Sequence, residues 1–276
     1  MIKLNDIVIE QNHFPDKTLN IKLPEKWDRY FFFYEGPPKI VISWYYENDS
    51  ELFTIICLTK QIKSSRPNSC IELFLPYVPH ARMDRTKNEN DIFTLKYFCE
   101  VINSLEFESV KVFDPHSDVV TALINNCRVN IITNDILETF YPIDSPNLLL
   151  FYPDNGAEKK YGSTIKKNYT FGIKHRDWIT GKIESYRIAD PDKVKGRDIL
   201  IVDDICSYGG TFALAAKALK EAGARSVRLY VSHCEKNIFK GKIFEEGNID
   251  RVYTTNSLLR AEDVENDKIT VIELVL

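Results

Sequence analysis

Two adjacent carboxylates and two adjacent glycines stand close together in the second half of this chain. Asp203 and Asp204 follow an apolar, β-branched run that is typical of a buried parallel strand, and Gly209, Gly210 and Thr211 lead into an alanine-rich stretch. Backbone N–H groups at the start of a helix favour an anion, since the helix dipole reinforces them. The carboxylates can accept hydrogen bonds from the vicinal hydroxyls of a ribose. The pattern therefore indicates a site for a phosphorylated pentose.

A purely structural explanation of these residues has to be weighed against the binding site. Carboxylates after a strand are often solvated surface groups, and glycines can be needed only for the shape of a turn. Here a strand precedes the motif, and a helix predicted over Phe212–Ala222 and closed by Gly223 follows it. Such a context gives a short motif its meaning, so it favours the binding site.

Composition limits the class of protein. The 276 residues are enough for two domains with separate cores, and 44% hydrophobic and 28% charged residues are typical of a globular protein. A net charge of −4 gives no reason to expect nucleic acid as a partner. No apolar run is long enough to cross a bilayer, no signal peptide is recognisable, and the six scattered cysteines show no metal-binding spacing. We therefore expect a cytoplasmic protein with reduced thiols and no membrane partner.

Strand-like and helix-like segments alternate along both halves, which predicts an α/β fold of mainly parallel sheets flanked by helices. The first half is expected to contain strands near Lys39–Ser43, Ile71–Pro76, Val110–Phe113 and Val129–Ile132, and helices near Asp49–Lys63, Asp91–Leu105 and Asp118–Asn126. The second is expected to contain strands near Asn147–Tyr152, Thr170–Ile173, Ile199–Asp203, Ser226–Val231 and Ile249–Thr254, and helices near Gly156–Lys166, Phe212–Glu221 and Asn237–Glu246.

Two weaker segments suggest how these elements are divided. Two prolines and an acid in Phe140–Pro146 predict a boundary that separates a domain at 1–143 from a domain at 144–276. The polar and charged stretch Lys174–Lys195 is expected to form a mobile loop or a β-flap.

The segment Ile199–Thr211 resembles the phosphoribosyl-diphosphate-binding loop that type I phosphoribosyltransferases share with phosphoribosyl-diphosphate synthetases. The resemblance assigns sugar-phosphate binding to Asp203, Asp204, Ser207, Tyr208, Gly209, Gly210 and Thr211. The two families do opposite things with the same compound, so this loop alone does not choose between them.

A segment of the first half distinguishes the two families. Phe74–Arg85 reads FLPYVPHARMDR and is similar, with two replacements, to the PYxPYARQDR signature of phosphoribosyl-diphosphate synthetases. Arginines at the carboxyl edge of a sheet suit bidentate binding of a polyphosphate, although a solvated basic loop is the ordinary explanation of arginines alone. The resemblance implies that Arg82 and Arg85 contact the phosphates of ATP and that Asp84 organises them.

Further segments match the same family in the same order. VFDPHSD resembles a strand end whose histidine, here His116, helps to hold the Mg–ATP phosphates. FYPDNG resembles a turn that places a metal-coordinating aspartate at Asp154, and a carboxylate is a ligand that Mg²⁺ prefers. KHR resembles the catalytic flexible loop, whose lysine and arginine, here Lys174 and Arg176, neutralise charge in the transition state.

The segment HFPDKT near the N-terminus is similar to the family's FxDGE segment. In that family the phenylalanine packs on adenine, often across a subunit interface, so the resemblance assigns Phe14 and Asp16 to ATP binding. It also implies a homo-oligomer, at least a dimer.

The resemblance implies two tandem type I phosphoribosyltransferase-like domains and a diphosphokinase reaction. The β,γ-diphosphoryl group of ATP would pass to the anomeric C1 hydroxyl of ribose 5-phosphate, AMP would leave, and Mg²⁺ on His116 and Asp154 would polarise the triphosphate. The N-terminal domain would carry the ATP-binding arginines. The C-terminal domain would carry the sugar-phosphate loop and the mobile catalytic loop.

The chain departs from the family where the acceptor's 5-position is expected. The family loop usually reads D-T-G-G-T, whereas Ser207 and Tyr208 precede the glycines here, Thr18 replaces an acid, and Cys234 replaces a glycine. Two acceptors stay open. The loop can bind the phosphate of ribose 5-phosphate, or it can accept a larger 5-substituent, as in ADP-ribose, with adenine stacked on Tyr208. Loss of the loop acid removes repulsion against additional negative charge.

Two other classes of protein compete with the synthetase. A nucleobase phosphoribosyltransferase would have no use for the arginine signature or the DPHSD strand end. A catalytically silent, synthetase-associated subunit would not need Lys174, Arg176, His116 and Asp154, all of which are present. We therefore expect an active Mg–ATP-dependent diphosphotransferase.

Overall fold

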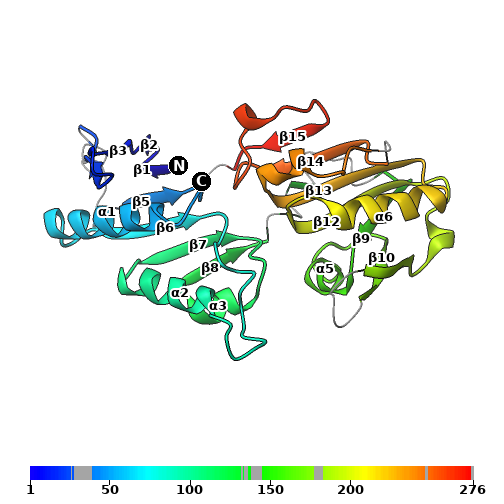
Figure 1. Cartoon of the computed structure of the whole chain (residues 1–276), viewed down its shortest axis with the longest axis horizontal. Coiled ribbons are helices and arrows are strands. Elements are labelled where there is room, and N and C mark those ends of the chain that lie inside the picture. The colour runs from blue at the N-terminus through cyan, green and yellow to red at the C-terminus, as the bar shows by residue number, and fades with distance from the viewer. Residues whose placement is uncertain are drawn as a thin grey trace. The chain divides into compact units, whose positions relative to one another are not determined.

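Parallel strands form the centre of two separate sheets in a computed structural model of the chain (Figure 1). The structure describes residues 1–25, 27, 39–131, 133, 136–137, 145–176, 183–245 and 248–274. The chain divides into two compact units, Met1–Ile131 and Ile132–Leu276. The boundary predicted between residues 143 and 144 lies outside the described residues. The expected α/β class with mainly parallel sheets is confirmed.

The sheet of the N-terminal unit has the strand order β2-β1-β5-β6-β7-β8. Strands β5 to β8 are parallel to one another, and β1 and β2 add an antiparallel edge. The strands span Ile2–Leu4 (β1), Ile7–Val8 (β2), Lys39–Trp44 (β5), Cys70–Leu75 (β6), Ser109–Phe113 (β7) and Cys127–Asn130 (β8). The helices span Glu51–Ser65 (α1), Thr94–Ser104 (α2) and Val119–Leu123 (α3), and a separate hairpin is formed by Gln11–His13 (β3) and Leu19–Ile21 (β4).

The period of two along each strand explains the core of this unit. Alternate residues of the parallel strands, such as Ile40 and Ile42 on β5 or Leu73 and Leu75 on β6, belong to one cluster with the buried side chains of α1 and α2. Each fully buried aliphatic side chain of this kind stabilises the fold by about 1.5–3 kcal/mol. The packing fixes the carboxyl ends of β6 and β7, after which the predicted ATP-binding segments follow.

The sheet of the C-terminal unit has the strand order β11-β10-β9-β12-β13-β14-β15. Strands β10, β9, β12, β13, β14 and β15 are parallel to their neighbours, and β11 is an antiparallel edge strand. The strands span Leu148–Tyr152 (β9), Tyr169–Arg176 (β10), Ile183–Ile188 (β11), Asp198–Cys206 (β12), Ser226–Cys234 (β13), Arg251–Thr255 (β14) and Ile269–Ile272 (β15). The α-helices span Asn155–Tyr161 (α5) and Gly210–Glu221 (α6), and 3₁₀ turns span Pro191–Lys193 (η2), Lys236–Lys240 (η3) and Ala261–Asp263 (η5).

The central strands of this sheet are buried on both faces. Ile199, Leu200, Ile201 and Val202 of β12 are all fully buried. Ile199 and Ile201 pack in the cluster that includes Ala215 and Ala216 of α6, and Figure 1 shows α6 lying along the sheet beside β12 and β13. A strand covered on both faces needs a continuous apolar run, which is why the sequence signal there was strong.

One predicted helix is not observed, and one of two expected forms is found for another segment. The helix expected at Asn237–Glu246 is wrong, because no α-helix forms over the described residues 237–245; the 3₁₀ turn η3 ends at Lys240 and Gly241 is extended. A Cβ atom on Gly241 would lie 1.9 Å from the carbonyl oxygen of Tyr208, so the chain passes directly along the sugar-phosphate loop instead of continuing as a helix. In the described parts of the stretch Lys174–Lys195, strands β10 and β11 pair as an antiparallel β-flap and η2 follows, in agreement with the second of the two expected forms.

All six cysteines are free thiols and at least half-buried. None of the helices in the described part of the chain is long and apolar enough to span a membrane.

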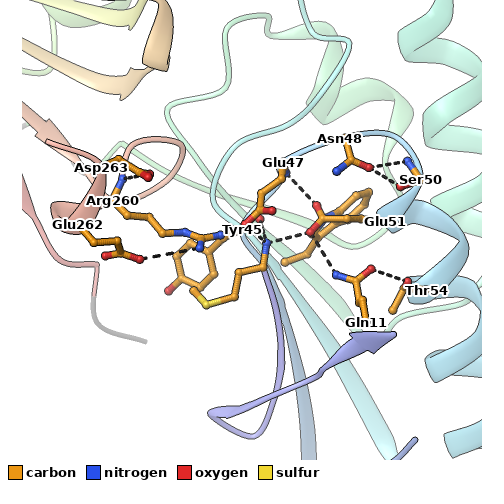
Figure 2. A network of polar contacts seen from close by, with 12 residues as sticks. Gln11, Tyr45, Glu47, Asn48, Ser50, Glu51, Thr54, Arg260, Glu262 and Asp263 are labelled. Atoms are coloured by element: carbon orange, nitrogen blue, oxygen red, sulfur yellow. Dashed lines mark hydrogen bonds and ion pairs between the residues drawn. The ribbon is translucent and has the colours of Figure 1, made fainter. Parts of the chain in front are cut away.

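A buried carboxylate connects three elements of the N-terminal unit. Glu51, at the start of α1, is 2% exposed, and it accepts hydrogen bonds from Trp44 Nε1 and from the backbone nitrogen of Glu47, both at 2.8 Å. Gln11 lies 3.5 Å from the same carboxylate and accepts a hydrogen bond from Thr54 Oγ1 at 2.8 Å (Figure 2). Through Gln11, the network anchors the hairpin that carries Phe14 and Asp16.

We predict that Glu51→Ala lowers the free energy of unfolding by about 2–4 kcal/mol, because it leaves buried donors without an acceptor. Glu51→Gln should cost less, since its amide oxygen still accepts one of these hydrogen bonds. Equilibrium urea unfolding followed by tryptophan fluorescence measures both. Glu100→Ala, which removes an exposed carboxylate from α2, is the control and should change stability by less than about 0.5 kcal/mol. Equal stability of Glu51→Ala and this control would contradict the role of the network.

Candidate active site

The predicted ribose-binding carboxylates lie near the end of β12. The strand continues to Cys206, so Asp203 and Asp204 are part of it rather than following it. Asp204 is 5% exposed, and its Oδ2 forms an ion pair with Nζ of Lys160 on α5 at 2.9 Å. Asp203 accepts a hydrogen bond from the backbone nitrogen of Asp204 at 2.9 Å. Because β9 is the parallel neighbour of β12, the residue that follows β9 lies at the same edge of the sheet.

Asp154 stands at this edge, two residues after the end of β9, and its two carboxylate oxygens make different contacts. Oδ1 caps α5 by accepting hydrogen bonds from the backbone nitrogens of Gly156 and Ala157 at 2.9 and 3.0 Å. Oδ2 forms an ion pair with Nζ of Lys174 at 2.9 Å, and the Lys174 side chain is only 9% exposed. The structure therefore brings together two residues that the sequence placed in separate motifs.

The pKa values of Asp203 and Asp154 are shifted in opposite directions. Burial and the negative charges of Asp204 and Asp154 raise the pKa of Asp203 from 3.8 to about 8. Burial would also raise the pKa of Asp154, but the hydrogen bonds from Lys174 and from the start of α5 outweigh it and lower this pKa overall. The environment of Asp203 is thus short of positive charge.

This shortage fits a divalent cation. Carboxylate oxygens are the ligands that Mg²⁺ prefers, and a cation beside Asp203 would favour its charged form. Among the described residues, no group of three or more His, Cys, Asp and Glu side chains is arranged to hold a metal ion. Mg²⁺ would therefore need oxygens from a bound phosphate in addition to Asp154 or Asp203. The role expected for His116 as a ligand stays a prediction.

The loop after β12 has a shape that requires its glycines. Gly209 has a φ of +76°, and a Cβ atom there would lie 2.7 Å from Ile243. Helix α6 begins at Gly210, so the backbone N–H groups of Gly210 and Thr211 belong to its first turn. Tyr208 is 55% exposed, and Ser207 donates a hydrogen bond to Glu235 at 2.6 Å. An anion-binding helix start and an exposed aromatic ring thus occur in one loop.

The strand that carries Lys174 is held close to the end of β9. A Cβ atom on Gly172 would lie 2.1 Å from the hydroxyl oxygen of Tyr186 and 2.8 Å from the carbonyl oxygen of Pro153. The Tyr186 hydroxyl donates a hydrogen bond to that carbonyl at 3.1 Å, and burial raises the Tyr186 pKa. This contact between β11 and the residue before Asp154 fixes the base of the hairpin. The side chain of Arg176 lies outside the described residues.

The residues predicted to bind ATP in the segments after β6 and β7 come from the ends of two neighbouring strands. Asp84 follows β6 and accepts hydrogen bonds from Arg85 Nε at 2.9 Å and from Ser117 Oγ at 2.8 Å. Ser117 stands next to His116 after β7, so the arginine segment and the DPHSD segment are joined directly. Burial opposes the ionised form of Asp84, but the contacts with Ser117 and Arg85 lower its pKa overall. Arg82, Arg85 and His116 are exposed.

Phe14 and Asp16 lie in the turn of the β3–β4 hairpin. Phe14 is 51% exposed, which leaves its ring accessible. Asp16 Oδ1 accepts hydrogen bonds from the backbone nitrogen and the hydroxyl of Thr18 at 3.0 and 2.7 Å. Thr18, which replaces an acid of the family pattern, therefore orients Asp16 within the turn.

Sequence reasoning missed three residues of this site. Lys160 neutralises Asp204, Tyr186 contacts the end of β9, and Glu235 contacts Ser207. Lys160 lies on the helix predicted after Asp154, but its spacing gives no signal that it would pair with Asp204 of a distant strand. Tyr186 and Glu235 reach the site only through strand pairing, which no local pattern indicates.

The fold and this site define a phosphoribosyltransferase-like α/β protein. The family described as phosphoribosyl transferase domain matches residues 162–246. The phosphoribosylpyrophosphate synthetase of Mycobacterium smegmatis shares the fold, with a TM-score of 0.68 and 20% identity over 96% of this chain and 86% of its own.

Curated relatives point to one family. A ribose-phosphate pyrophosphokinase of Pyrococcus abyssi is 25% identical, and the match covers 99% of this chain and 90% of the relative. A ribose-phosphate pyrophosphokinase of Campylobacter jejuni is 28% identical over 80% of this chain and 72% of the relative. The chain is thus similar, over most of its length, to proteins named ribose-phosphate pyrophosphokinase, which supports its resemblance to the phosphoribosyl-diphosphate synthetase family.

We predict that Asp203→Asn changes the dependence of stability on pH. The pKa of Asp203 in the folded protein, about 8, lies above its ordinary value of 3.8. Its stabilising contribution is therefore complete below pH 4 and is lost as the pH rises to about 8. The Tm of the wild type should fall relative to that of Asp203→Asn between pH 5 and pH 8, as measured by calorimetry. Asp192→Asn, at an exposed position, is the control. Parallel curves for all three proteins would contradict the prediction.

Proposed function

We propose that this chain transfers the β,γ-diphosphoryl group of ATP to the anomeric C1 hydroxyl of a ribose 5-phosphate-type acceptor and releases AMP. The observation that carries the proposal is the placement of Asp203 and Asp204 directly before a loop that opens α6 with backbone N–H groups. The names of the relatives support the same reaction, because ribose-phosphate pyrophosphokinase describes this transfer.

The acceptor is held by its hydroxyls and by its 5-substituent. Asp203 and Asp204 accept hydrogen bonds from the ribose hydroxyls, and the 2.9 Å ion pair with Lys160 holds the Asp204 carboxylate in place. The N–H groups of Gly209, Gly210 and Thr211 receive the phosphate oxygens at the positive end of α6. Contacts with the ribose hydroxyls and with the 5-phosphate together orient the C1 hydroxyl for attack.

Lys174 supplies positive charge to the transferred group. The attack occurs at the β-phosphorus, and negative charge on the phosphate oxygens has to be compensated as it redistributes. The ion pair with Asp154 holds the ammonium group of the nearly buried Lys174 in a defined place before substrates bind. Arg176, two residues further along β10, is proposed as the second cation on the basis of the family pattern.

The N-terminal unit is proposed to bind ATP. Arg82 and Arg85 are exposed for phosphate contacts, and the link between Asp84 and Ser117 holds their segment against that of His116. Phe14, exposed on the hairpin, offers a ring for adenine, and Asp16 lies beside it. In this proposal, 1–143 is the ATP-binding domain and 144–276 is the domain of the acceptor and the catalytic loop. We also propose that the chain works as a homo-oligomer.

Mg²⁺ is the proposed cofactor, with Asp154 and Asp203 as its protein ligands in the C-terminal unit and His116 as a further ligand suggested by the family. When bound, the cation neutralises and polarises the triphosphate. The Asp154 oxygen that would face a cation is the one that pairs with Lys174, since its other oxygen caps α5.

A larger acceptor, such as ADP-ribose, is the second candidate. The exposed ring of Tyr208 favours it, because a half-exposed phenol beside the anion-binding loop can stack on a base. The product would then be ADP-ribose 1-diphosphate, a compound suited to rebuilding a nicotinamide nucleotide.

We predict that Lys174→Ala lowers the rate of AMP release from Mg–ATP and acceptor by about a thousandfold or more, with the fold intact, because the transferred group loses the positive charge that Lys174 supplies. Mass spectrometry and circular dichroism measure the products and the fold. Lys193→Ala is the control, since this exposed lysine pairs only with its neighbour Asp190 in the described contacts. Full residual activity of Lys174→Ala would contradict its catalytic role.

The two acceptors are distinguished by measuring kcat/KM for AMP release with ribose 5-phosphate and with ADP-ribose. If Tyr208 stacks on a base, Tyr208→Thr should shift the ratio of the two values toward ribose 5-phosphate by about tenfold. Tyr208→Phe keeps the ring and should leave the ratio close to that of the wild type. An unchanged ratio in Tyr208→Thr would exclude the stacking role.

A further inference from the structure

A carboxylate from the segment after β13 lies against the sugar-phosphate loop. Oε2 of Glu235 accepts hydrogen bonds from Ser207 Oγ at 2.6 Å and from Asn237 Nδ2 at 3.0 Å. The backbone N–H of Glu235 donates to the carbonyl oxygen of Cys206 at 2.8 Å. Three hydrogen bonds therefore fix Glu235 at the point where the loop begins.

This contact changes what the loop offers to an anion. A serine hydroxyl has one proton to donate, and that of Ser207 is directed to Glu235 rather than to a phosphate oxygen. The carboxylate also adds negative charge beside the loop. The adjacent cation, Lys236, forms an ion pair with Asp263 at 2.8 Å, so its charge is shared with another carboxylate.

We infer that Glu235 is a specificity-determining residue that selects acceptors by the charge of their 5-substituent. The inference rests on the proposed function, in which the loop holds this substituent. A terminal phosphate monoester carries nearly two negative charges at pH 7, whereas a phosphate esterified on both sides carries one. The Glu235 carboxylate disfavours the second charge. The acceptor class that it favours is a ribose whose 5-phosphate is esterified to a further group.

The test compares two acceptors that differ in this charge and by a single methyl group, ribose 5-phosphate and ribose 5-(methyl phosphate). Glu235→Gln keeps the size of the side chain and an oxygen that accepts from Ser207, but it removes the charge. We expect it to raise kcat/KM for ribose 5-phosphate by about tenfold, chiefly through KM, and to change the value for the methyl ester by less than about threefold.

The control is Glu262→Gln, which removes an exposed carboxylate, 70% accessible, from the same unit. It should leave the ratio of the two kcat/KM values unchanged. If Glu235→Gln fails to fold, as judged by circular dichroism, Glu235→Ala tests the same charge and should shift the ratio in the same direction. Equal effects on both acceptors, or no effect on either, would overturn the inference.

A failure of the proposed function has a different signature. If the wild type releases no AMP with either acceptor, the transfer reaction is wrong, and calorimetric binding of ribose 5-phosphate without ATP then decides the role of Glu235. About tenfold tighter binding by Glu235→Gln than by the wild type would still support charge selection, and equal binding would refute it.

Discussion

Three carboxylates crowd the carboxyl ends of β9 and β12, and the rest of the site depends on how their charge is balanced. Lys174 pairs with Asp154 and Lys160 pairs with Asp204, whereas burial and its two acidic neighbours keep the pKa of Asp203 high. The two lysines come from β10 and α5, the two elements that follow β9 in the sequence. A site of this kind is preorganised for a polyhydroxylated, phosphorylated ligand, because such a ligand supplies both hydroxyl donors and, with its cation, positive charge.

The parts of the fold that the sequence predicted are those with a local cause. The run from Ile199 to Thr211 combines a strand buried on both faces, acids at its end and glycines at a helix start, and each feature is visible within a few residues. The short edge strands β1 to β4 were not predicted, because two or three residues carry too little periodicity. The helix expected at Asn237–Glu246 failed for a non-local reason, since the loop around Tyr208 occupies its path.

The residues of the candidate site also separate into those with a local sequence signal and those placed by non-local contacts. The residues with motif-like spacing were predicted, and the structure joins several of them in pairs, such as Asp154 with Lys174 and the neighbour of His116 with Asp84. Residues that support the motifs from another strand had no signal of their own. Tyr186 and Glu235 are ordinary hairpin and strand-end residues in the sequence, and only the pairing of β10 with β11 and of β12 with β13 gives them a function.

The segment after β13 determines both the shape and the charge of the sugar-phosphate loop. Gly241 approaches the Tyr208 backbone and Ile243 fills the space beside Gly209, so the loop cannot rearrange without moving this segment. Glu235, from the same segment, binds Ser207. The sequence of the loop alone shows the loss of an acid, which predicts tolerance of more negative charge. In the structure, Glu235, which directly follows the neighbouring strand β13, places a carboxylate beside the loop. The loop therefore does not gain the tolerance of additional negative charge that its own sequence predicts. Under the proposed function, a singly charged phosphodiester linkage suits the loop better than a terminal phosphate, because it carries less negative charge next to Glu235. The exposed Tyr208 ring remains available to the group that the linkage carries.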